Sequence, residues 1–127
     1  MSTDKRIKIA VIEDEESIKD IYVFKLKKEG FDVRYAIDGE AGLTLCEDYK
    51  PDLILLDLMM PKMTGEDMLE ELRKFDWAKD IKVIILTNIS KDEAPSKLRL
   101  LNVDRYIIKA HYTPKQVVDI VREVLKS

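Results

Sequence analysis

The sequence predicts an α/β fold built on an open parallel sheet, and two observations carry the prediction. Short apolar runs alternate with stretches of helical periodicity from one end of the chain to the other. The run that leads to Asp57 is apolar at every position from Leu53 to Leu56, which is typical of a strand covered on both faces. Strands that alternate with helices form parallel sheets with right-handed crossovers. We predict strands at 7–12, 33–36, 53–57, 83–87 and 105–108, and helices at 16–29, 39–49, 65–75, 91–101 and 114–126.

Several helix ends carry recognisable capping residues. Thr113 provides an N-cap hydroxyl, Pro114 suits the first helical position, and Gln116 completes a capping box. Gly30 is placed to end the first helix. Pro95 lies in the first turns of the helix predicted at 91–101, where it lacks a backbone donor. We therefore expect that helix to start late or to be distorted.

Composition limits the classes of protein to consider. The 127 residues suffice for one domain, and the balance of 46% hydrophobic and 37% charged residues is that of a globular protein. The net charge of −3 argues against a general nucleic-acid-binding surface, which is normally basic. A single cysteine, Cys46, cannot form an internal disulfide and suits a small core position. No apolar stretch approaches the roughly 18 residues that span a bilayer, and the N-terminal segment lacks the pattern of a secretory signal, so we expect a cytoplasmic protein.

Polar side chains stand where four of the predicted strands end. Glu13 and Asp14 follow the first, Asp57 ends the third, Thr87 ends the fourth and Lys109 follows the fifth. The carboxyl ends of parallel strands share one edge of the sheet, which is where open α/β sheets bind ligands. Three converging carboxylates repel one another, so either a cation offsets the repulsion or at least one carboxyl group keeps its proton. Mg²⁺ prefers such oxygen ligands and is the natural cation here. Asp57 would then be a nucleophile toward a phosphoryl group, with the Lys109 ammonium and the Thr87 hydroxyl stabilising its oxygens.

These residues, in this order and spacing, give the chain a specific resemblance to response-regulator receiver domains of two-component and phosphorelay signalling, over essentially its whole length. The matching segments are Glu13-Asp14, Asp57-Leu-Met-Met-Pro-Lys-Met-Thr-Gly65, Thr87 and Tyr106-Ile-Ile-Lys109. The resemblance implies a flavodoxin-like (βα)5 three-layer sandwich with strand order 2-1-3-4-5. It also implies that residues 1–127 form one receiver domain, without an output domain.

The resemblance also implies roles for single residues. Asp57 would accept a phosphoryl group from phosphohistidine, and Thr87 and Lys109 would contact the phosphoryl oxygens. Mg²⁺ would be held by Glu13, Asp14 and Asp57 and by the backbone carbonyl of Met59. Thr87 would move toward the new charge and Tyr106 would swing inward. This would repack the surface formed by the fourth helix, the fifth strand and the fifth helix.

The implied partners are a histidine kinase or phosphotransfer protein and an unknown downstream protein, with no direct contact to nucleic acid or membrane. We expect a monomer or a weak, phosphorylation-dependent homodimer. Ile18 and Ile21 lie beside the acidic pair in a helix that is apolar on more than one stripe. They either dock the phosphoryl donor or are buried against the sheet. The protein would not be an enzyme beyond catalysing its own phosphorylation and dephosphorylation.

The sequence departs from the family pattern at three places. Ala110 follows Lys109 where the family usually has a proline after a cis bond, and we expect Ala110 to be held cis so that Lys109 still reaches Asp57. Asn88 replaces a small residue after Thr87, and the apolar Met59 and Ile89 lie two positions beyond Asp57 and Thr87. We expect these side chains to limit the access of water and so to prolong the phosphoryl lifetime. The third departure, Glu13 where Asp is also common, keeps the charge for metal binding.

Three other functions share parts of this sequence pattern. A phosphohydrolase with an aspartate nucleophile typically carries a second Asp two residues later, where this chain has Met59. A flavodoxin needs a phosphate-binding loop after the first strand, where the run from Glu13 to Glu16 would repel a phosphate. The third is a receiver-like module that binds proteins without taking a phosphoryl group. The changes at Asn88 and Ala110 keep that alternative open.

Overall fold

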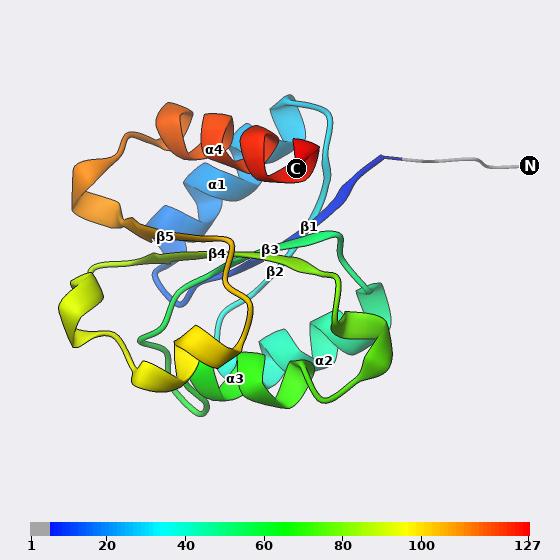
Figure 1. Ribbon diagram of the computed structural model, residues 1–127. Helices are drawn as coiled ribbons and strands as arrows, with labels where there is room; N and C mark the ends of the chain where they lie inside the picture. The colour runs from blue at the N-terminus through cyan, green and yellow to red at the C-terminus, as the bar shows by residue number, and fades with distance from the viewer. Residues whose placement is uncertain (1–5) are drawn as a thin grey trace, which may run out of the picture.

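A computed structural model describes residues 6–127, in which five parallel strands form one sheet (Figure 1). The strand order is β2-β1-β3-β4-β5, which confirms the flavodoxin-like prediction. The strands lie within a residue or so of the predicted bounds. They are β1 (Lys8–Ile12), β2 (Asp32–Ala36), β3 (Leu53–Leu56), β4 (Lys82–Thr87) and β5 (Arg105–Ile108).

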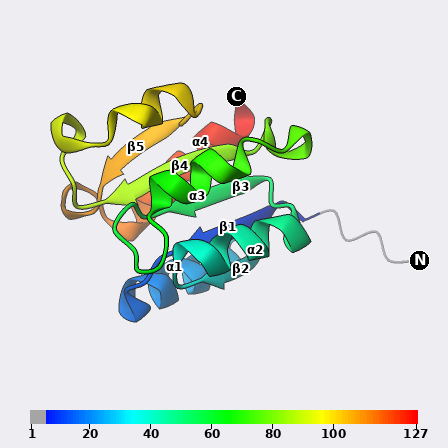
Figure 2. The ribbon, with the colours of Figure 1, turned by 90° about the horizontal axis from the view of Figure 1, so that it is seen from below.

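Helices cover both faces of the sheet. Figure 1 shows α1 (Glu16–Lys28) and α4 (Pro114–Lys126) on one face, and α2 (Gly39–Tyr49) and α3 (Gly65–Leu72) on the other, which Figure 2 presents from below. Alternate strand residues therefore enter two separate cores. In β1, for example, Ile9 packs in the core under α1 and α4, whereas Ala10 packs in the core under α2 and α3. Burial on both faces explains why the central strands are apolar at consecutive positions.

The predicted capping residues act at the helix ends. In α1 the Gly30 amide donates to the Lys27 carbonyl at 3.0 Å and the Phe31 amide to the Leu26 carbonyl at 3.2 Å, with Gly30 at φ +96°. These two bonds form a Schellman motif, whose left-handed residue is most easily a glycine. At α4 the Thr113 hydroxyl and the Gln116 side chain each accept the other residue's backbone N–H, at 3.2 and 2.8 Å.

The helix predicted at 91–101 is wrong as an α-helix, although the expected distortion at Pro95 is present. Two short 3-10 turns stand there, η2 (Lys91–Glu93) and η3 (Ser96–Leu100). Ala94 and Pro95 between them are extended, with ψ of 147° and 131°. A proline biases the preceding residue away from helical ψ and cannot donate a helical hydrogen bond, so the segment divides at this point.

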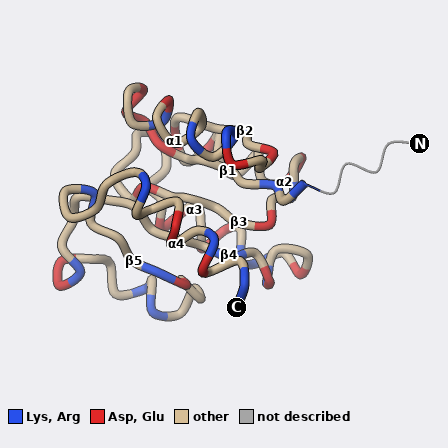
Figure 3. The backbone as a smooth tube through the Cα atoms, turned by 90° about the horizontal axis from the view of Figure 1, so that it is seen from above, with Lys and Arg blue, Asp and Glu red and all other residues tan. Residues whose placement is uncertain are grey.

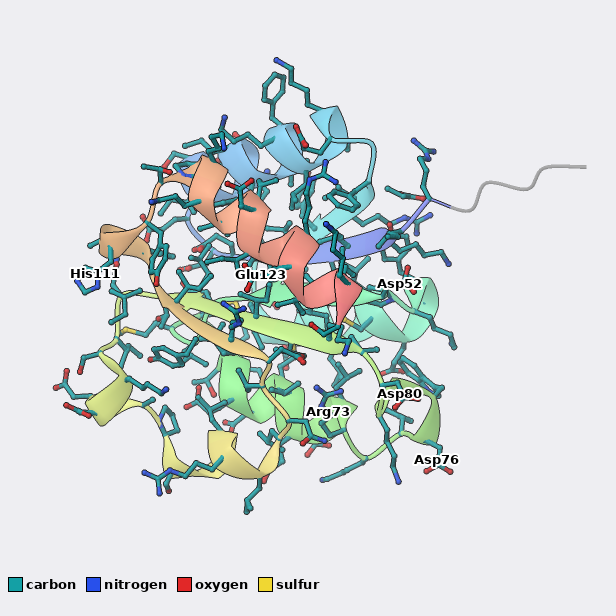
Figure 4. All side chains as sticks on the ribbon, turned by 45° about the horizontal axis from the view of Figure 1, so that its top comes forward. Asp52, Arg73, Asp76, Asp80, His111 and Glu123 are labelled. Atoms are coloured by element: carbon teal, nitrogen blue, oxygen red, sulfur yellow. The ribbon has the colours of Figure 1, made fainter. Side chains whose placement is uncertain are left out.

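Arg73 holds this divided segment against α3, which ends at Leu72 rather than at residue 75 as predicted. Its guanidinium donates to the carbonyls of Leu101 (2.9 Å) and Asn102 (3.0 Å) just after η3. It also donates to two carbonyls at the end of the 3-10 turn η1 (Asp76–Ala78). Figure 4 labels Arg73 on the α3 side of the sheet. The half-buried Arg73 guanidinium thus provides hydrogen-bond donors for backbone carbonyls at the end of η1 and after η3, two connections with little regular structure.

The surface carries both signs of charge. Lys and Arg residues are interspersed with Asp and Glu along the helices of the α1 and α4 face (Figure 3), so no single-sign field of the kind that binds nucleic acid covers it. In the part of the chain that the structure describes, no helix combines the length and apolarity needed to cross a bilayer. The N-terminal segment, in which no secretory signal is predicted, lies mostly outside that part. Cys46 is buried in the core, as predicted.

Candidate functional site

Asp57 lies at the carboxyl edge of the sheet, directly after β3. Figure 4 shows how far apart the two edges are, with His111 beyond the end of β5 and Asp52 before the start of β3 on opposite sides of the molecule. The Asp57 side chain is buried at 5% exposure. Its Oδ1 accepts the backbone N–H of Leu58 at 2.7 Å and that of Met59 at 3.4 Å. These bonds fix the carboxylate and stabilise its charge within an apolar surrounding.

The start of α3 is fitted closely against Asp57. The Gly65 amide donates to the Leu58 carbonyl at 2.9 Å. A Cβ at Gly65 would lie 2.1 Å from the Asp57 carbonyl oxygen, so only glycine fits at this position. The helix begins here because Thr64 caps it, accepting the Asp67 amide at 3.3 Å. The loop after β3 therefore returns to the edge of the sheet and closes over the Asp57 backbone.

Three carboxylates meet at this edge. Glu13 is buried at 3% exposure and Asp14 is exposed, and each has an oxygen within 4.8 Å of one on the others and on Asp57. This is the set predicted from the sequence. Two buried carboxylates and one exposed carboxylate form a cluster of hard oxygen donors, of which Asp14 faces solvent. This donor set fits Mg²⁺, which keeps several waters and takes few protein ligands.

Lys109 is the only lysine among the described residues that reaches these carboxylates. Its Nζ lies 2.7 Å from Glu13 Oε1 and 3.2 Å from Asp57 Oδ2. Burial favours the neutral amine, but the hydrogen bond to Glu13 and the charges of Asp57 and Glu13 outweigh it, so the pKa of Lys109 is raised. Lys109 therefore stays charged and bridges two buried acids that would otherwise repel each other.

One ammonium does not neutralise the whole group of acids. Burial, followed by the charge of Asp57, raises the pKa of Glu13 to about 7, although hydrogen bonds from Lys109 and Glu15 act in the opposite direction. Carboxyl groups whose pKa is raised by burial and a like charge are common at functional sites. This effect is a physical sign of a functional site that does not depend on any resemblance.

Glu15 also belongs to this site, although nothing in the sequence distinguishes it from the acidic run that contains it. Its Oε1 lies 3.6 Å from Lys109 Nζ, and its side chain is 55% exposed. Its backbone N–H donates to Glu13 Oε2 at 3.1 Å. Lys109 therefore faces three acids, two in the interior and one at the opening.

The backbone at Lys109 corrects the expectation of a cis bond. Every peptide bond in residues 6–127 is trans, including the bond from Lys109 to Ala110. The chain enters a 3-10 turn, η4 (Lys109–His111), in which the Tyr112 amide approaches the Lys109 carbonyl at 3.4 Å. Because this turn lets the Lys109 side chain reach Asp57 and Glu13 with a trans backbone, nothing offsets the roughly 3 kcal/mol cost of a non-proline cis bond.

Thr87 and Tyr106 lie on neighbouring strands beside the acids. Thr87 ends β4, is 1% exposed, and pairs with Ile108 of β5, the residue before Lys109. Tyr106 is half-buried against the α2 and α3 core, and its hydroxyl donates to the Ile89 carbonyl at 2.7 Å. Tyr106 is thus already bonded to the connection that follows Thr87. The two residues occupy the places from which they could transmit a change at Asp57.

The remaining predicted residues differ in their exposure. Met59 is 66% exposed and Asn88 is exposed, whereas Ile89 is half-buried. Ile18 packs partly against the α1 and α4 core, while Ile21 is 43% exposed on α1. Ile18 is therefore partly buried against the sheet, whereas the exposure of Ile21 leaves docking of the phosphoryl donor a prediction.

Comparison with known proteins places this geometry in a family. The family model described as the response regulator receiver domain matches residues 9–122. The chain belongs to the response regulator receiver domain family. Receiver domains generally bind Mg²⁺, in agreement with the three carboxylates described above. The family assignment identifies the protein as a component of two-component signalling.

Relatives and solved structures agree with this assignment. The receiver domain is 37% identical over 121 residues to the alkaline phosphatase synthesis transcriptional regulatory protein PhoP of Bacillus subtilis, covering 94% of this chain and 48% of that protein. The chain thus spans about half the length of the curated relatives it matches. A CheY-like receiver domain protein from Methanospirillum hungatei superposes with a TM-score of 0.87 at 26% identity, over 96% of this chain and 95% of that one. The chemotaxis response regulator CheY4 of Vibrio cholerae shares the fold with a TM-score of 0.86 at 22% identity, over 94% and 99%.

Proposed function

We propose that this receiver domain accepts a phosphoryl group on Asp57 from the phosphohistidine of a histidine kinase or phosphotransfer protein, in a Mg²⁺-dependent reaction. The observation that supports this most strongly is the Lys109 ammonium, held 3.2 Å from Asp57 and 2.7 Å from Glu13 beside a three-carboxylate pocket. A buried carboxylate next to a fixed cation and an open metal pocket suits attack on a phosphoryl group.

In the proposed transfer, an Asp57 carboxylate oxygen forms a bond to phosphorus while the bond from phosphorus to the histidine nitrogen breaks. The electron pair of that bond stays with the departing imidazole. The pocket of Glu13, Asp14 and Asp57, with the Met59 carbonyl, would hold Mg²⁺, which when bound neutralises charge on the phosphoryl oxygens. Lys109 and the Thr87 hydroxyl would supply the remaining positive charge and a hydrogen-bond donor.

We propose that the signal leaves through the surface formed by η2, η3, β5 and α4, which corresponds to the surface expected from the sequence. A groove of about 660 Å³ lies on the η2, η3 and β5 part of this surface, and Tyr106, Leu98 and Val103 are among the residues that line it. If Thr87 moves toward a new phosphoryl group, the connection at Ile89 moves with it. The hydrogen bond from Tyr106 to Ile89 then carries that shift to the groove.

The proposed partners follow from this arrangement. The phosphoryl donor would approach Asp57 across Ile21, and an unidentified downstream protein would read the η3, β5 and α4 surface, without direct contact to nucleic acid or membrane. We propose a monomer, or a weak homodimer formed after phosphorylation, that acts in the cytoplasm and is no enzyme beyond its own phosphorylation and dephosphorylation. The reduced Cys46 thiol and the mixed surface charge fit this setting.

Incubation with acetyl phosphate and Mg²⁺, followed by intact mass measurement, tests the central step. The proposal expects a gain of one phosphoryl group that Asp57→Ala abolishes. Asp76→Asn is the matched control, because Asp76 is a 96% exposed carboxylate that lies far from the site and should not affect the gain. No gain from acetyl phosphate or from a phosphohistidine donor would instead favour a receiver-like module that binds proteins without phosphorylation.

The lifetime of the phosphoryl group is a separate part of the proposal. Met59 at the opening and Ile89 beside it would restrict the water that hydrolyses the aspartyl phosphate. We expect a lifetime well beyond seconds, measured as the decay of the phosphorylated mass after the donor is removed. A half-life of seconds would show that these side chains do not exclude water.

A further inference from the structure

Glu15 occupies an unusual place at the entrance to the site. It is the N-cap residue of α1, with extended backbone at φ −78° and ψ 109°, yet its side chain makes no capping hydrogen bond. An N-cap side chain normally accepts a backbone N–H of the first helical turn. The Glu15 carboxylate points instead toward Lys109, 3.6 Å from its Nζ. Its position therefore reflects the site rather than the stability of the helix.

Lys109 does not depend on Glu15 for its position. Glu13 and Asp57 hold the ammonium at 2.7 and 3.2 Å, and their side chains are 4% and 6% exposed. The Glu15 side chain is 55% exposed, so its interaction with Lys109 is longer and is screened by solvent. Glu15 also lies outside the group of carboxylates whose oxygens come within 4.8 Å of one another. Any effect of Glu15 on the site must therefore come from its negative charge near Lys109.

That charge affects two ligands in opposite ways. The site already has three carboxyl groups, Glu13, Asp14 and Asp57, against one ammonium, and Glu15 adds a fourth. A divalent cation is attracted by the extra charge, whereas a phosphodonor dianion approaching Asp57 is repelled by it. One side chain can thus favour loading of the metal and slow the entry of the donor.

We propose that Glu15 is a charge-setting residue of the phosphorylation site, which strengthens Mg²⁺ binding and slows phosphorylation by small dianionic donors. This inference rests on the proposed phosphorylation of Asp57. Glu15 would make the site discriminate between protein donors and small donors. A phosphoryl donor that docks as a protein gains binding energy from the rest of its interface, so the charge of Glu15 affects its binding less. Glu15 would therefore protect Asp57 from metabolites such as acyl phosphates.

The test uses three variants and two measurements. The first is the initial rate of phosphorylation by acetyl phosphate as a function of Mg²⁺ concentration. The second is the Mg²⁺ dissociation constant from calorimetric titration without any phosphoryl donor, which should rise in Glu15→Gln together with the half-saturating concentration. Glu15→Gln should raise the rate at saturating Mg²⁺ about fivefold and raise the half-saturating Mg²⁺ concentration by a similar factor, at low ionic strength. Glu15→Asp keeps the charge and should behave as the unmodified protein. Glu16→Gln is the matched control, since Glu16 also lies in the first turn of α1 but makes no ion pair with Lys109 among the described residues.

Salt separates a charge effect from a change of shape. At about 0.5 M salt exposed charges are largely screened. The changes that Glu15→Gln causes in the phosphorylation rate and in the half-saturating Mg²⁺ concentration should both nearly disappear there. The proposal is overturned if Glu15→Gln and Glu16→Gln behave alike, if the rate and the half-saturating concentration do not both rise, or if the gain persists at high salt. Its failure is distinct from failure of the proposed function, in which the unmodified protein would take no phosphoryl group at any Mg²⁺ concentration.

Discussion

The raised pKa of Glu13 predicts that the metal-free protein loses stability as the pH rises. A carboxyl group normally titrates near 4.5, and Glu13 in the fold titrates near 7. Between these values the folded chain keeps a proton that the unfolded chain has released, so the free energy of unfolding falls with increasing pH. This is the reverse of the usual behaviour of a salt-bridged acid, because burial and the neighbouring Asp57 outweigh Lys109.

The size of the effect follows from the two pKa values. A pKa difference of one is worth about 1.4 kcal/mol, so the loss between pH 5 and pH 8 is about 2.5 kcal/mol, nearly complete above pH 7. Glu13 is 3% exposed, so little of this is screened by solvent. The raised pKa of Lys109 does not contribute in this range, because Lys109 is charged in both the folded and the unfolded states until the pH passes its ordinary value near 10.5.

Urea unfolding in the presence of a chelator, at several pH values between 5 and 8, measures this loss. The variant Glu13→Gln should remove the slope, since a glutamine oxygen still accepts the Lys109 hydrogen bond but does not ionise. Mg²⁺ at about 100 times its dissociation constant should restore about 2.7 kcal/mol to the unmodified protein at pH 8. Equal pH slopes for the unmodified protein and Glu13→Gln would refute the assignment of the loss to this residue.

Three further predictions concern stability and its link to the site. Arg73→Gln should cost about 3 kcal/mol in urea unfolding, because it removes hydrogen bonds to four backbone carbonyls; a cost below about 1 kcal/mol would contradict this role. Gly65→Ala should abolish phosphorylation of Asp57, measured by intact mass, because the new Cβ would clash with the Asp57 carbonyl; normal phosphorylation would show that α3 can retreat freely. Thr113→Ala should lower stability by about 1 kcal/mol and leave phosphorylation unchanged, because the capping box lies at the start of α4; an altered phosphorylation rate would link this helix end to Asp57.

Most of the fold could be predicted from local patterns. The bounds of α2, α4 and β5 match the predictions, because Thr113 and Gln116 cap a strongly amphipathic helix and because β5 is a short, largely apolar run. The helix predicted at 91–101 failed for one local reason, which the sequence indicated, and one tertiary reason. Pro95 divided it, and Arg73, distant in sequence, supplied hydrogen-bond donors for carbonyls after η3 that a single-sequence pattern cannot reveal.

The site shows the same division between sequence and structure. By itself the sequence determined which residue types stand at the strand ends, and hence that Glu13, Asp14, Asp57 and Lys109 would share one edge of a parallel sheet. Only the tertiary structure decided that Lys109 bridges Glu13 and Asp57 from a trans backbone, and that Glu15 leans over the opening. The physical reason is that side-chain direction, burial and charge coupling depend on contacts across the sheet, whereas the order of strands and caps is encoded in neighbouring residues.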